Sequence, residues 1–317
     1  MPDLRQLRAL QAIAETGSFS RAADLLNYTQ PAISKTIAAL ERELGAVLVD
    51  RECRPLRLTD AGNALARHAV DVFAGLSSAQ AEIDAITQLE GGSLHVGTFG
   101  SAASSFVVRT LCEFRRRHPG VRIGLVDGHP QPLIRRLRAG ELDLAAVFDY
   151  PAAGHDVGEG LELHHLLDQP YDIVLPRGHR LAGEPGVHPA QLADEDWLLP
   201  DVGAENPMMK LLRRMFDSAG FEPRVAFTVN DCKMVLAMVA ADGGVSIVPR
   251  LMIDPVPADV AVLPVIGDRP IQRVSVARLP SRYLTPASGT FLSMLREAAR
   301  RRVESWPHAG LVHEATA

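Results

Sequence analysis

The chain has 317 residues, of which 47% are hydrophobic and 22% are charged, and its formal net charge at pH 7 is −5. This length allows two or three domains, and the composition excludes a disordered or fibrous protein. The negative net charge excludes a general polyanion binder, so any nucleic-acid binding must use positive charge that is concentrated locally.

The sequence carries no sign of a membrane span or of export. It contains no run of about eighteen apolar residues, and it starts Met-Pro-Asp without a basic-then-apolar leader. The three cysteines, Cys53, Cys112 and Cys232, are far apart and lack the spacing of metal ligands. We therefore expect a cytoplasmic protein with reduced thiols, no metal site and no contact with a membrane.

Residues 18–44 predict two short helices around a tight turn, a helix-turn-helix. Ser18 suits the N-cap of the first helix, and Asn27 ends it. The inner face of this helix is small and apolar and consists of Ala22, Ala23, Leu25 and Leu26. Thr29 can cap the second helix, and Pro31 lies in its first turn, where a missing N–H costs nothing. The second helix then has one buried face, made of Ile33, Ile37, Leu40 and Leu44.

The opposite face of the second helix carries, near its start, hydrogen-bonding side chains of the kind that read base edges in a major groove. We predict that this end of the helix binds DNA through Thr29, Gln30, Pro31, Ser34 and Lys35. The alternative is a polar helix face that is only solvated, which is the usual fate of such a face taken alone.

A hairpin resembling the wing of a winged helix follows. Two short apolar runs, 47–49 and 56–58, are joined by a turn that contains Arg51, Arg54 and Pro55. Arginines at such a tip can reach phosphate or a narrow minor groove, so Arg51 and Arg54 are candidate DNA contacts. The alternative is a solvated loop that happens to be basic.

Residues 61–89 form a proline-free stretch with a heptad pattern. Its apolar residues step alternately by four and three and are Leu65, Ala69, Val72, Leu76, Ala79, Ile83 and Ile86. A single helix cannot bury so narrow a stripe, so we expect it to pair with the same helix of a second subunit. The paired reading helices would then meet major grooves about 34 Å apart, or a multiple of this distance, on a partly palindromic site. The alternative is packing against the chain's own domains.

At Glu90-Gly91-Gly92 the rhythm changes, and we expect a hinge there. Short apolar strands at 93–99, 121–126 and 142–148 alternate with helices at 103–118 and 132–139. This β-α-β-α-β winding predicts a parallel sheet that is covered by helices and binds ligands at the carboxyl ends of its strands.

A second lobe is expected from about residue 161. Its strands are predicted at 171–175, 197–199, 224–228, 244–248 and 260–265, and its helices at 207–219 and 232–241. A strand at 272–278 and a helix at 286–302 could return to the first lobe. The result would be two lobes joined by crossing strands, as in the clamp of a binding protein.

The motifs of the first 62 residues, taken in order, closely resemble the LysR-type transcriptional regulators. They are Leu4 to Ala14, Ala22-Ala23-Asp24-Leu25-Leu26, Gln30 to Lys35, Leu40-Glu41-Arg42-Glu43-Leu44-Gly45 and Leu58-Thr59-Asp60-Ala61-Gly62. One departure is Val49, where the family usually has Phe. The resemblance continues in Phe114-Arg-Arg-Arg-His-Pro-Gly-Val, Leu137-Arg-Ala-Gly-Glu-Leu-Asp-Leu-Ala and Val239-Ala-Ala-Asp-Gly-Gly-Val-Ser-Ile-Val-Pro.

This resemblance implies an α+β multidomain protein with a periplasmic-binding-protein-like C-terminal half. We expect a winged helix-turn-helix at 1–60, a dimerising linker helix and hinge at 61–92, and a two-lobed effector-binding domain at 93–303, followed by a tail at 304–317. Lobe I would comprise about 93–160 and 268–303, and lobe II about 161–267.

The family places its effector at the turn that follows the first strand, which here is Thr98, Phe99, Gly100 and Ser101. Backbone N–H groups and hydroxyls at this turn could hold a polar or anionic group, and simple N-capping is the alternative. Positions after other strands or before helices add Gly128, His129, Phe148, Val202, Gly203 and Asn230 as candidate pocket walls. Asp149 and Asp231 occupy similar positions, but such acids are more often turn residues or caps.

We therefore predict a sequence-specific DNA-binding regulator that responds to a small-molecule effector, with no cofactor and no catalytic activity, because no GxSxG, HExxH, Walker loop or GxGxxG motif is present. Its expected partners are double-stranded DNA, the effector, a second copy in a homodimer or the tetramer usual in the family, and, as a further candidate, RNA polymerase. The alternatives are a small-molecule carrier, or a redox sensor that uses Cys112 and Cys232.

Overall fold

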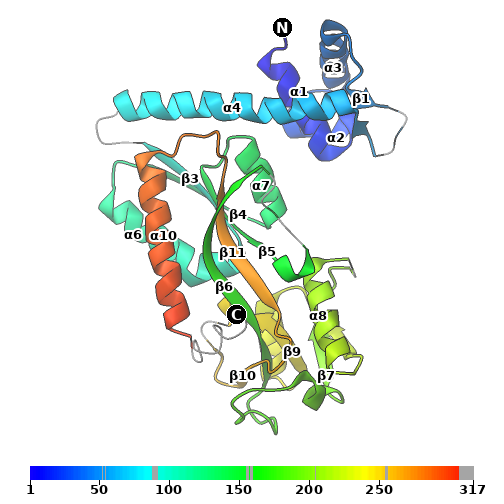
Figure 1. Cartoon of the computed structure of the whole chain (residues 1–317), viewed down its shortest axis with the longest axis vertical. Helices are drawn as coiled ribbons and strands as arrows, with labels where there is room; N and C mark the ends of the chain where they lie inside the picture. Colours follow the sequence, from blue (N-terminus) through cyan, green and yellow to red (C-terminus); the bar gives the residue numbers. More distant parts are fainter. Residues whose placement is uncertain are drawn as a thin grey trace. The chain divides into compact units, whose positions relative to one another are not determined.

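The computed structural model describes the chain except for residues 52, 54, 88–91, 155–156, 158–159, 204, 254–255 and 307–317. The chain forms two compact units (Figure 1). The N-terminal unit is Met1–Ile83 with two short segments, Arg138–Gly140 and Ser281–Tyr283. The C-terminal unit contains the other residues from Asp84 onward. The predicted hinge residues Glu90 and Gly91 lie outside the described residues.

The N-terminal unit is a winged helix-turn-helix followed by a long helix. Its elements are α1 (Leu4–Thr16), α2 (Phe19–Leu26), α3 (Gln30–Leu44), β1 (Val49–Asp50), β2 (Arg57–Leu58) and α4 (Asp60–Thr87). The two strands pair antiparallel, with Val49 opposite Leu58. Buried alanines on α1 and α2 allow these helices to approach α3 closely around a core that includes Leu10, Ile37 and Leu40.

The predicted boundaries of the helix-turn-helix are confirmed at α2 and only in part at α3. The Ser18 hydroxyl accepts a hydrogen bond from the N–H of Arg21, and Asn27 ends α2 in the left-handed conformation with φ +57°. Thr29 occupies the N-cap of α3, but its side chain makes no capping hydrogen bond.

Two leucines that were predicted to be buried are exposed. Leu25 is 52% exposed and Leu44 is 41% exposed. Successive helical residues turn by about 100°, so Leu25 is about 60° from Ala22 but about 160° from Ala23, at the edge of the buried face. Leu44 shares the buried face of α3 but is the last residue of this helix, where a helix end leaves the core.

Three motif residues fix the wing against the helices. The Glu41 carboxylate accepts hydrogen bonds from the backbone N–H groups of Leu48 (2.9 Å) and Val49 (3.2 Å). A Cβ atom on Gly62 would lie 2.1 Å from the carbonyl oxygen of Leu48, so only glycine permits α4 to pass this close to the wing. The Thr59 hydroxyl donates to the Val47 carbonyl at 2.7 Å and accepts from the Gly62 N–H at 3.1 Å.

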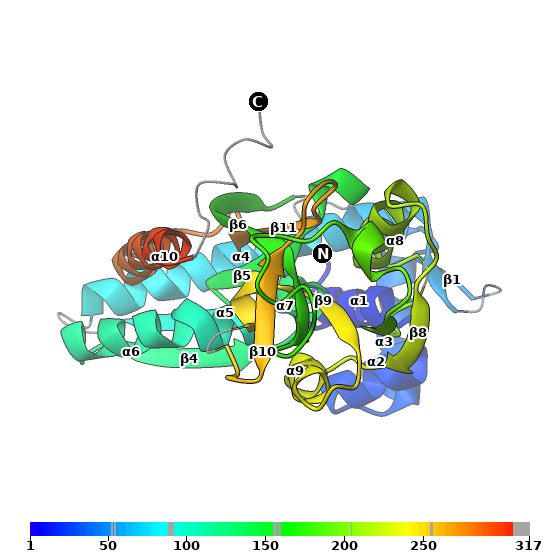
Figure 2. The ribbon, with the colours of Figure 1, turned by 90° about the horizontal axis from the view of Figure 1, so that it is seen from below.

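The C-terminal unit is a mixed sheet with helices packed on it (Figure 2). Its strands are β3 (Ser93–Thr98), β4 (Arg122–Asp127), β5 (Leu144–Asp149), β6 (Glu162–Pro176), β7 (Asp196–Leu199), β8 (Arg224–Thr228), β9 (Val245–Pro249), β10 (Val260–Pro264) and β11 (Ile271–Arg278). Its helices are α5 (Gly100–Ala102), a π-helical turn (Ala103–Val107), α6 (Val108–Arg117), α7 (Pro130–Arg138), α8 (Pro207–Ser218), α9 (Cys232–Ala240) and α10 (Pro286–Glu304). Short 3-10 turns occur at Pro151–Ala153, Pro189–Leu192 and Arg250–Met252.

The strand order divides the sheet into two lobes that share two strands. Lobe I has the order β4-β3-β5-β11-β6, in which β3, β4 and β5 are parallel. Lobe II consists of β10, β6, β9, β7 and β8, in which β7, β8 and β9 are parallel. The first half of β6 pairs with β11, and its second half pairs with β9 and β10. Figure 1 shows β6 and β11 side by side through this unit, which is the crossing that the sequence predicted.

Each lobe has its own apolar core. In lobe I, Phe114 of α6 and Phe291 of α10 pack edge to face with ring centroids 5.6 Å apart over the central strands. In lobe II, Trp197 of β7 packs against Phe216 of α8 at 4.9 Å. The buried run at Leu144–Val147 is typical of a central parallel strand that is covered on both faces.

Two predicted elements of the C-terminal unit begin more than two residues before their predicted starts. The helix predicted at 103–118 begins at Gly100 and contains the π-helical turn, where the Ser104 hydroxyl donates to the carbonyls of Gly100 (3.1 Å) and Ser101 (3.3 Å). The strand predicted at 171–175 is the second half of β6, which begins at Glu162. Its polar first half resembles a loop in sequence but is held by β11 and α10.

Asp172 is the only fully buried acidic residue among the described residues, and it joins three segments of the C-terminal unit. Its carboxylate pairs with the guanidinium of Arg250, at 2.6 Å, and with that of Arg269. Arg269 also donates from Nε to the carbonyl of Tyr171 at 3.2 Å. The pairs connect β6 to the turn after β9 and to the segment before β11.

Replacement of Asp172 by Ala should lower the free energy of unfolding by about 3 to 5 kcal/mol, because two guanidinium groups would stay near the interior without their carboxylate. Urea unfolding of the full chain measures this change. Glu297→Ala is the control, since Glu297 pairs with Arg300 and Arg301 at the surface, where ion pairs contribute little. Equal midpoints for the two variants would contradict the role given to Asp172.

Candidate DNA-binding surface and ligand cavity

The start of α3 presents most of its predicted DNA-binding residues to solvent. Thr29, Gln30, Pro31 and Lys35 are exposed, and Ser34 is half-buried. The other side of the same turns is closed, because Ile33 and Ile37 lie in the core. Within the described part of the chain, the side chains of Gln30, Ser34 and Lys35 form no hydrogen bond or ion pair. This end of α3 therefore offers polar groups that the fold itself does not use.

The two predicted wing arginines differ. The Arg51 guanidinium lies 3.0 Å from the Glu41 carboxylate and 5.5 Å from the centroid of the Phe19 ring. Arg51 thus has a structural role in the unit, although its side chain remains 48% exposed. Arg54 lies outside the described residues.

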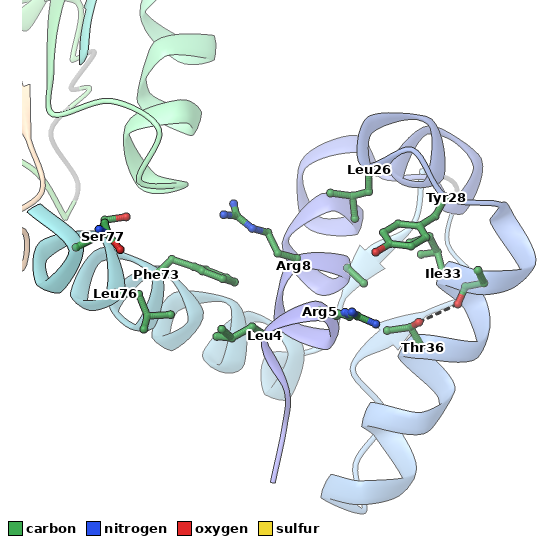
Figure 3. Close-up of a pocket in the computed structure, with 13 residues that line it drawn as sticks. Leu4, Arg5, Arg8, Leu26, Tyr28, Ile33, Thr36, Phe73, Leu76 and Ser77 are labelled. Atoms are coloured by element: carbon green, nitrogen blue, oxygen red, sulfur yellow. Dashed lines mark hydrogen bonds between the residues drawn. The ribbon is translucent and has the colours of Figure 1, made fainter. Parts of the chain in front are cut away.

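A groove of about 630 Å³ lies between α1, the start of α3 and α4 in the N-terminal unit (Figure 3). Its walls are mostly carbon and include Leu4, Leu26, Tyr28, Ile33, Phe73 and Leu76. Arg8 also lines the groove, and its guanidinium lies over the Phe73 ring, 4.3 Å from the ring centroid. The heptad residues Val72, Leu76 and Ile83 of α4 are 42%, 49% and 52% exposed. The part of the predicted seam from Val72 to Ile83 is thus largely uncovered within a single chain, whereas Ala69 is buried and Leu65 packs against the core of this unit.

The C-terminal unit encloses a second cavity of about 530 Å³ between its two lobes. Lobe I contributes residues that follow β3, β4 and β5, and lobe II contributes residues from β7, β9 and the starts of α8 and α9. Both crossing strands also reach it, through Tyr171 and Gln272. A volume of this size suits a small organic molecule.

Most of the predicted effector-binding residues line this cavity. They are Phe99, Gly100, Ser101, Gly128, His129, Phe148, Val202 and Asn230. Thr98 does not line the cavity, because it is completely buried with its hydroxyl 3.5 Å from the carbonyl of Phe99. Gly203 is exposed outside it. Asp231 caps α9 by accepting from the N–H of Met234, the alternative that the sequence left open.

The sequence analysis missed several cavity residues that lie within strands, directly after a strand or at the start of α8. They include Asp127, Tyr150, Tyr171, Met208, Ser246 and Gln272. Asp127 immediately precedes the predicted Gly128, so the rule about strand ends could have found it. Nothing in the local sequence marks Tyr171 or Gln272, since their direction depends on the register of β6 with β11.

Aromatic rings form a continuous wall on the lobe I side of the cavity. The Phe148 ring lies 4.8 Å from that of Phe99 and 5.8 Å from that of Tyr150, both edge to face. The His129 ring lies 5.7 Å from Phe148 on a further side. This packing holds the wall rigid and apolar.

A chain of buried hydrogen bonds runs from the crossing strands to the cavity. Gln169 Oε1 accepts from the Leu251 N–H at 3.0 Å, and Gln169 Nε2 donates to Gln272 Oε1. Gln272 Nε2 in turn donates to the Tyr150 hydroxyl at 2.6 Å, which is hydrogen-bonded to the Tyr171 hydroxyl at 2.8 Å. This network of hydrogen bonds therefore fixes the two tyrosines of the cavity wall, Tyr150 and Tyr171, relative to both lobes.

The architecture is that of a ligand-responsive DNA-binding regulator: a winged helix-turn-helix, a long helix and a two-lobed unit around a cavity. Comparison with known proteins identifies the group. Residues 4–63 match the model of the bacterial regulatory helix-turn-helix proteins of the lysR family. Residues 87–300 match the model of the LysR substrate binding domain.

Full-length relatives agree with these matches. The chain is 32% identical over 300 residues to the probable HTH-type transcriptional regulator LrrA of Synechococcus elongatus, which covers 94% of this chain and 97% of that protein. It resembles the crystal structure of HinK, a LysR family transcriptional regulator from Pseudomonas aeruginosa, with 27% identity and a TM-score of 0.56. The match covers 94% of this chain and 99% of HinK. It also shares the fold of full-length CbnR in complex with its target DNA, with 24% identity, a TM-score of 0.53 and coverage of 94% and 100%.

The chain therefore belongs to the LysR family, and it is a DNA-binding transcriptional regulator with an effector-binding domain. The family consists of transcriptional regulators. Among the helices that the structure describes, none has the length and apolar character needed to cross a membrane. The described residues also contain no group of three His, Cys, Asp or Glu side chains arranged to hold a metal ion.

Replacement of Gln272 by Leu should lower the free energy of unfolding by about 1 to 3 kcal/mol, because Gln169 would lose its buried acceptor and Tyr150 its donor. Thermal unfolding measures the effect. Gln131→Leu is the matched control, since Gln131 also lines the cavity but is exposed. A loss of stability for the control equal to that of Gln272→Leu would refute the role of the hydrogen-bonded chain.

Proposed function

We propose that two copies of this chain bind a partly palindromic operator through the first turns of α3, and that a small molecule held between the two lobes changes the arrangement of the paired modules. The observation that carries the proposal is the free polar start of α3 in a chain that also encloses a ligand cavity. Neither feature has a use in a protein that only folds.

The proposed reading surface consists of Thr29, Gln30, Pro31, Ser34 and Lys35. Gln30 and Ser34 have the donors and acceptors that base edges require, and Lys35 adds a cation for phosphate. Arg51, which Glu41 holds in place, is proposed to contact the DNA backbone beside α3. Arg54 is proposed to contact phosphate or the minor groove, as the sequence predicts. Because the net charge of the chain is −5, its affinity for DNA should come from this small surface, which each of the two copies in the dimer contributes once.

The second copy is proposed to cover the stripe of α4 and the adjacent groove. Leu76 belongs to both, as a heptad residue and as part of the groove wall. Burial of these half-exposed apolar side chains against an identical helix would supply the free energy of dimerisation. A tetramer, the usual family state, and contact with RNA polymerase remain proposals that rest on the family alone.

The effector is proposed to act as a population shift. It must bind one arrangement of the regulator better than the other, and the response cannot exceed that difference in affinity. The proposed contacts are the predicted cavity residues, among which the Ser101 hydroxyl forms no hydrogen bond with any residue that the structure describes.

We further propose that the chain acts without catalysis and, because its target is DNA, in the cytoplasm. Family membership supports both statements. A carrier function would leave the helix-turn-helix of residues 4–63 without a use. Nothing specific favours the redox alternative: Cys112 is exposed on α6, and the side chain of Cys232 is outside the described residues.

Genomic footprinting first identifies the operator. Replacement of Lys35 by Ala should then weaken binding to this operator by about tenfold, and it should reduce the slope of log affinity against log salt concentration by about one. Fluorescence anisotropy at several salt concentrations measures both. Arg42→Ala removes the same charge from the exposed last turn of α3 and should change affinity little. If the Lys35 variant binds like the wild type, α3 does not read DNA as proposed.

Replacement of Leu76 by Glu should raise the dissociation constant of the dimer at least about tenfold, because a carboxylate would enter an apolar seam. Analytical ultracentrifugation measures it. His68→Glu adds a carboxylate to the same helix at an exposed position outside the stripe and should leave the dimer intact. A Leu76 variant with the wild-type dissociation constant would show that α4 does not form the interface.

A further inference from the structure

We propose that the effector is an uncharged molecule built around an aromatic ring system, rather than an organic carboxylate. The inference rests on the proposed function of the cavity between the lobes and adds the chemical class of its ligand. It follows from the charge, the ring geometry and the polar groups of the cavity wall.

The described wall contains no Lys or Arg that could form a permanent ion pair with an anionic ligand. Among the described residues that line the cavity there is no Lys or Arg, and the only acid is Asp127. The residues of 93–317 outside the described part include no Lys or Arg in the sequence. A carboxylate that entered would lose its water, gain no ion pair and meet the like charge of Asp127.

Backbone N–H groups at Gly100 and Ser101, and those at the start of α7, favour an anion, whereas the starts of α8 and α9 are already capped by the side chains of Asn206 and Asp231. Each of these two helix starts contributes a fractional positive charge, which acts only over the first turn of its helix. The desolvation cost of a full carboxylate is several times larger than this attraction. A neutral carbonyl or hydroxyl can use the same N–H groups without that cost.

The wall is built to pack against rings. Phe148 is half-buried at the centre of the aromatic wall, with Phe99, Tyr150 and His129 around it. Met208 and Met252 supply flexible thioethers on other parts of the lining, and sulfur packs well against aromatic edges. A flat apolar ligand could therefore contact several walls at once.

The polar groups of the wall suit a neutral polar substituent. Besides the Ser101 hydroxyl, they include the amide of Asn206, whose oxygen already accepts from the N–H of Met208 at 3.0 Å and whose NH2 group is left as a donor. The Ser246 hydroxyl already donates to the carbonyl of Leu198 at 2.6 Å, which leaves it as an acceptor. Amides and hydroxyls bind uncharged donors and acceptors without leaving a charge unpaired.

The test uses the full-length protein at pH 8 and matched pairs of compounds that differ in charge. The pairs are benzamide and benzoate, 2-naphthamide and 2-naphthoate, and anthracene-2-carboxamide and its carboxylate. Melting temperature screens the six compounds, and calorimetry gives dissociation constants for those that bind. At least one amide should bind, and it should bind at least about tenfold more tightly than its carboxylate.

Two variants then connect the preference to the cavity. Asp127→Asn should strengthen binding of the matched carboxylate by about threefold, because it removes the like charge, and should leave the amide unchanged. Asp201→Asn removes an exposed carboxylate that does not line the cavity and should alter neither. Equal effects of the two variants would show that the preference arises elsewhere than in the wall.

A carboxylate that binds as tightly as its amide, or a panel in which no amide binds, would overturn the proposed class. The proposed function is checked separately, by binding of the same protein to its operator without any compound. Binding to DNA together with a preference for carboxylates would refute the class of effector alone. Failure to bind DNA would refute the function itself.

Discussion

The antiparallel pairing of β6 with β11 is the constraint on which the C-terminal unit depends. The single strand β6 serves lobe I with its first half and lobe II with its second half, so both lobes take their position from it. Gln169 and Gln272 face each other at this crossing, where both are buried. Since an unpaired buried amide is costly, only the observed register satisfies both side chains. The same register delivers Tyr171 and Gln272 to the cavity.

The motif residues of the N-terminal unit divide into those that the fold needs and those that it does not. Glu41 binds two backbone N–H groups of the wing and Arg51, and Gly62 lets α4 pass the Leu48 carbonyl. Gln30 and Lys35 have no comparable task within the described chain. A polar side chain that neither caps, pairs nor packs is free for a partner outside the chain. Separation of the two groups therefore gives the DNA-binding assignment a physical basis beside the family match.

The local sequence pattern was sufficient to predict the bounds of several helices and strands. The strand at Arg224–Thr228 has the predicted bounds, and α8 and α9 end within one residue of their predicted ends. Residues at or directly after the ends of strands, such as Phe148 and Gly128, reach the cavity because parallel strands bring their carboxyl ends to one edge of the sheet. The first half of β6 was not predicted, because His164 and Gln169 are held by Arg296 and Gln272, which lie more than one hundred residues later in the sequence. Tyr171 and Ser246 were missed because they lie inside strands, where the pairing with neighbouring strands and not the local sequence decides which residues line the cavity.

The apolar character of the cavity also bears on how a ligand can operate a switch. A contact made to one lobe alone, such as a hydrogen bond to Ser101, has the same free energy in any arrangement of the lobes, so it adds affinity but no response. Apolar burial between two walls grows as the walls approach. About 100 Å² of additional apolar surface buried on closure corresponds to about 2.5 kcal/mol, which is roughly a 70-fold preference for the closed arrangement. A ligand that packs against Phe148 in lobe I and Met208 in lobe II can therefore shift the population substantially without any ionic contact.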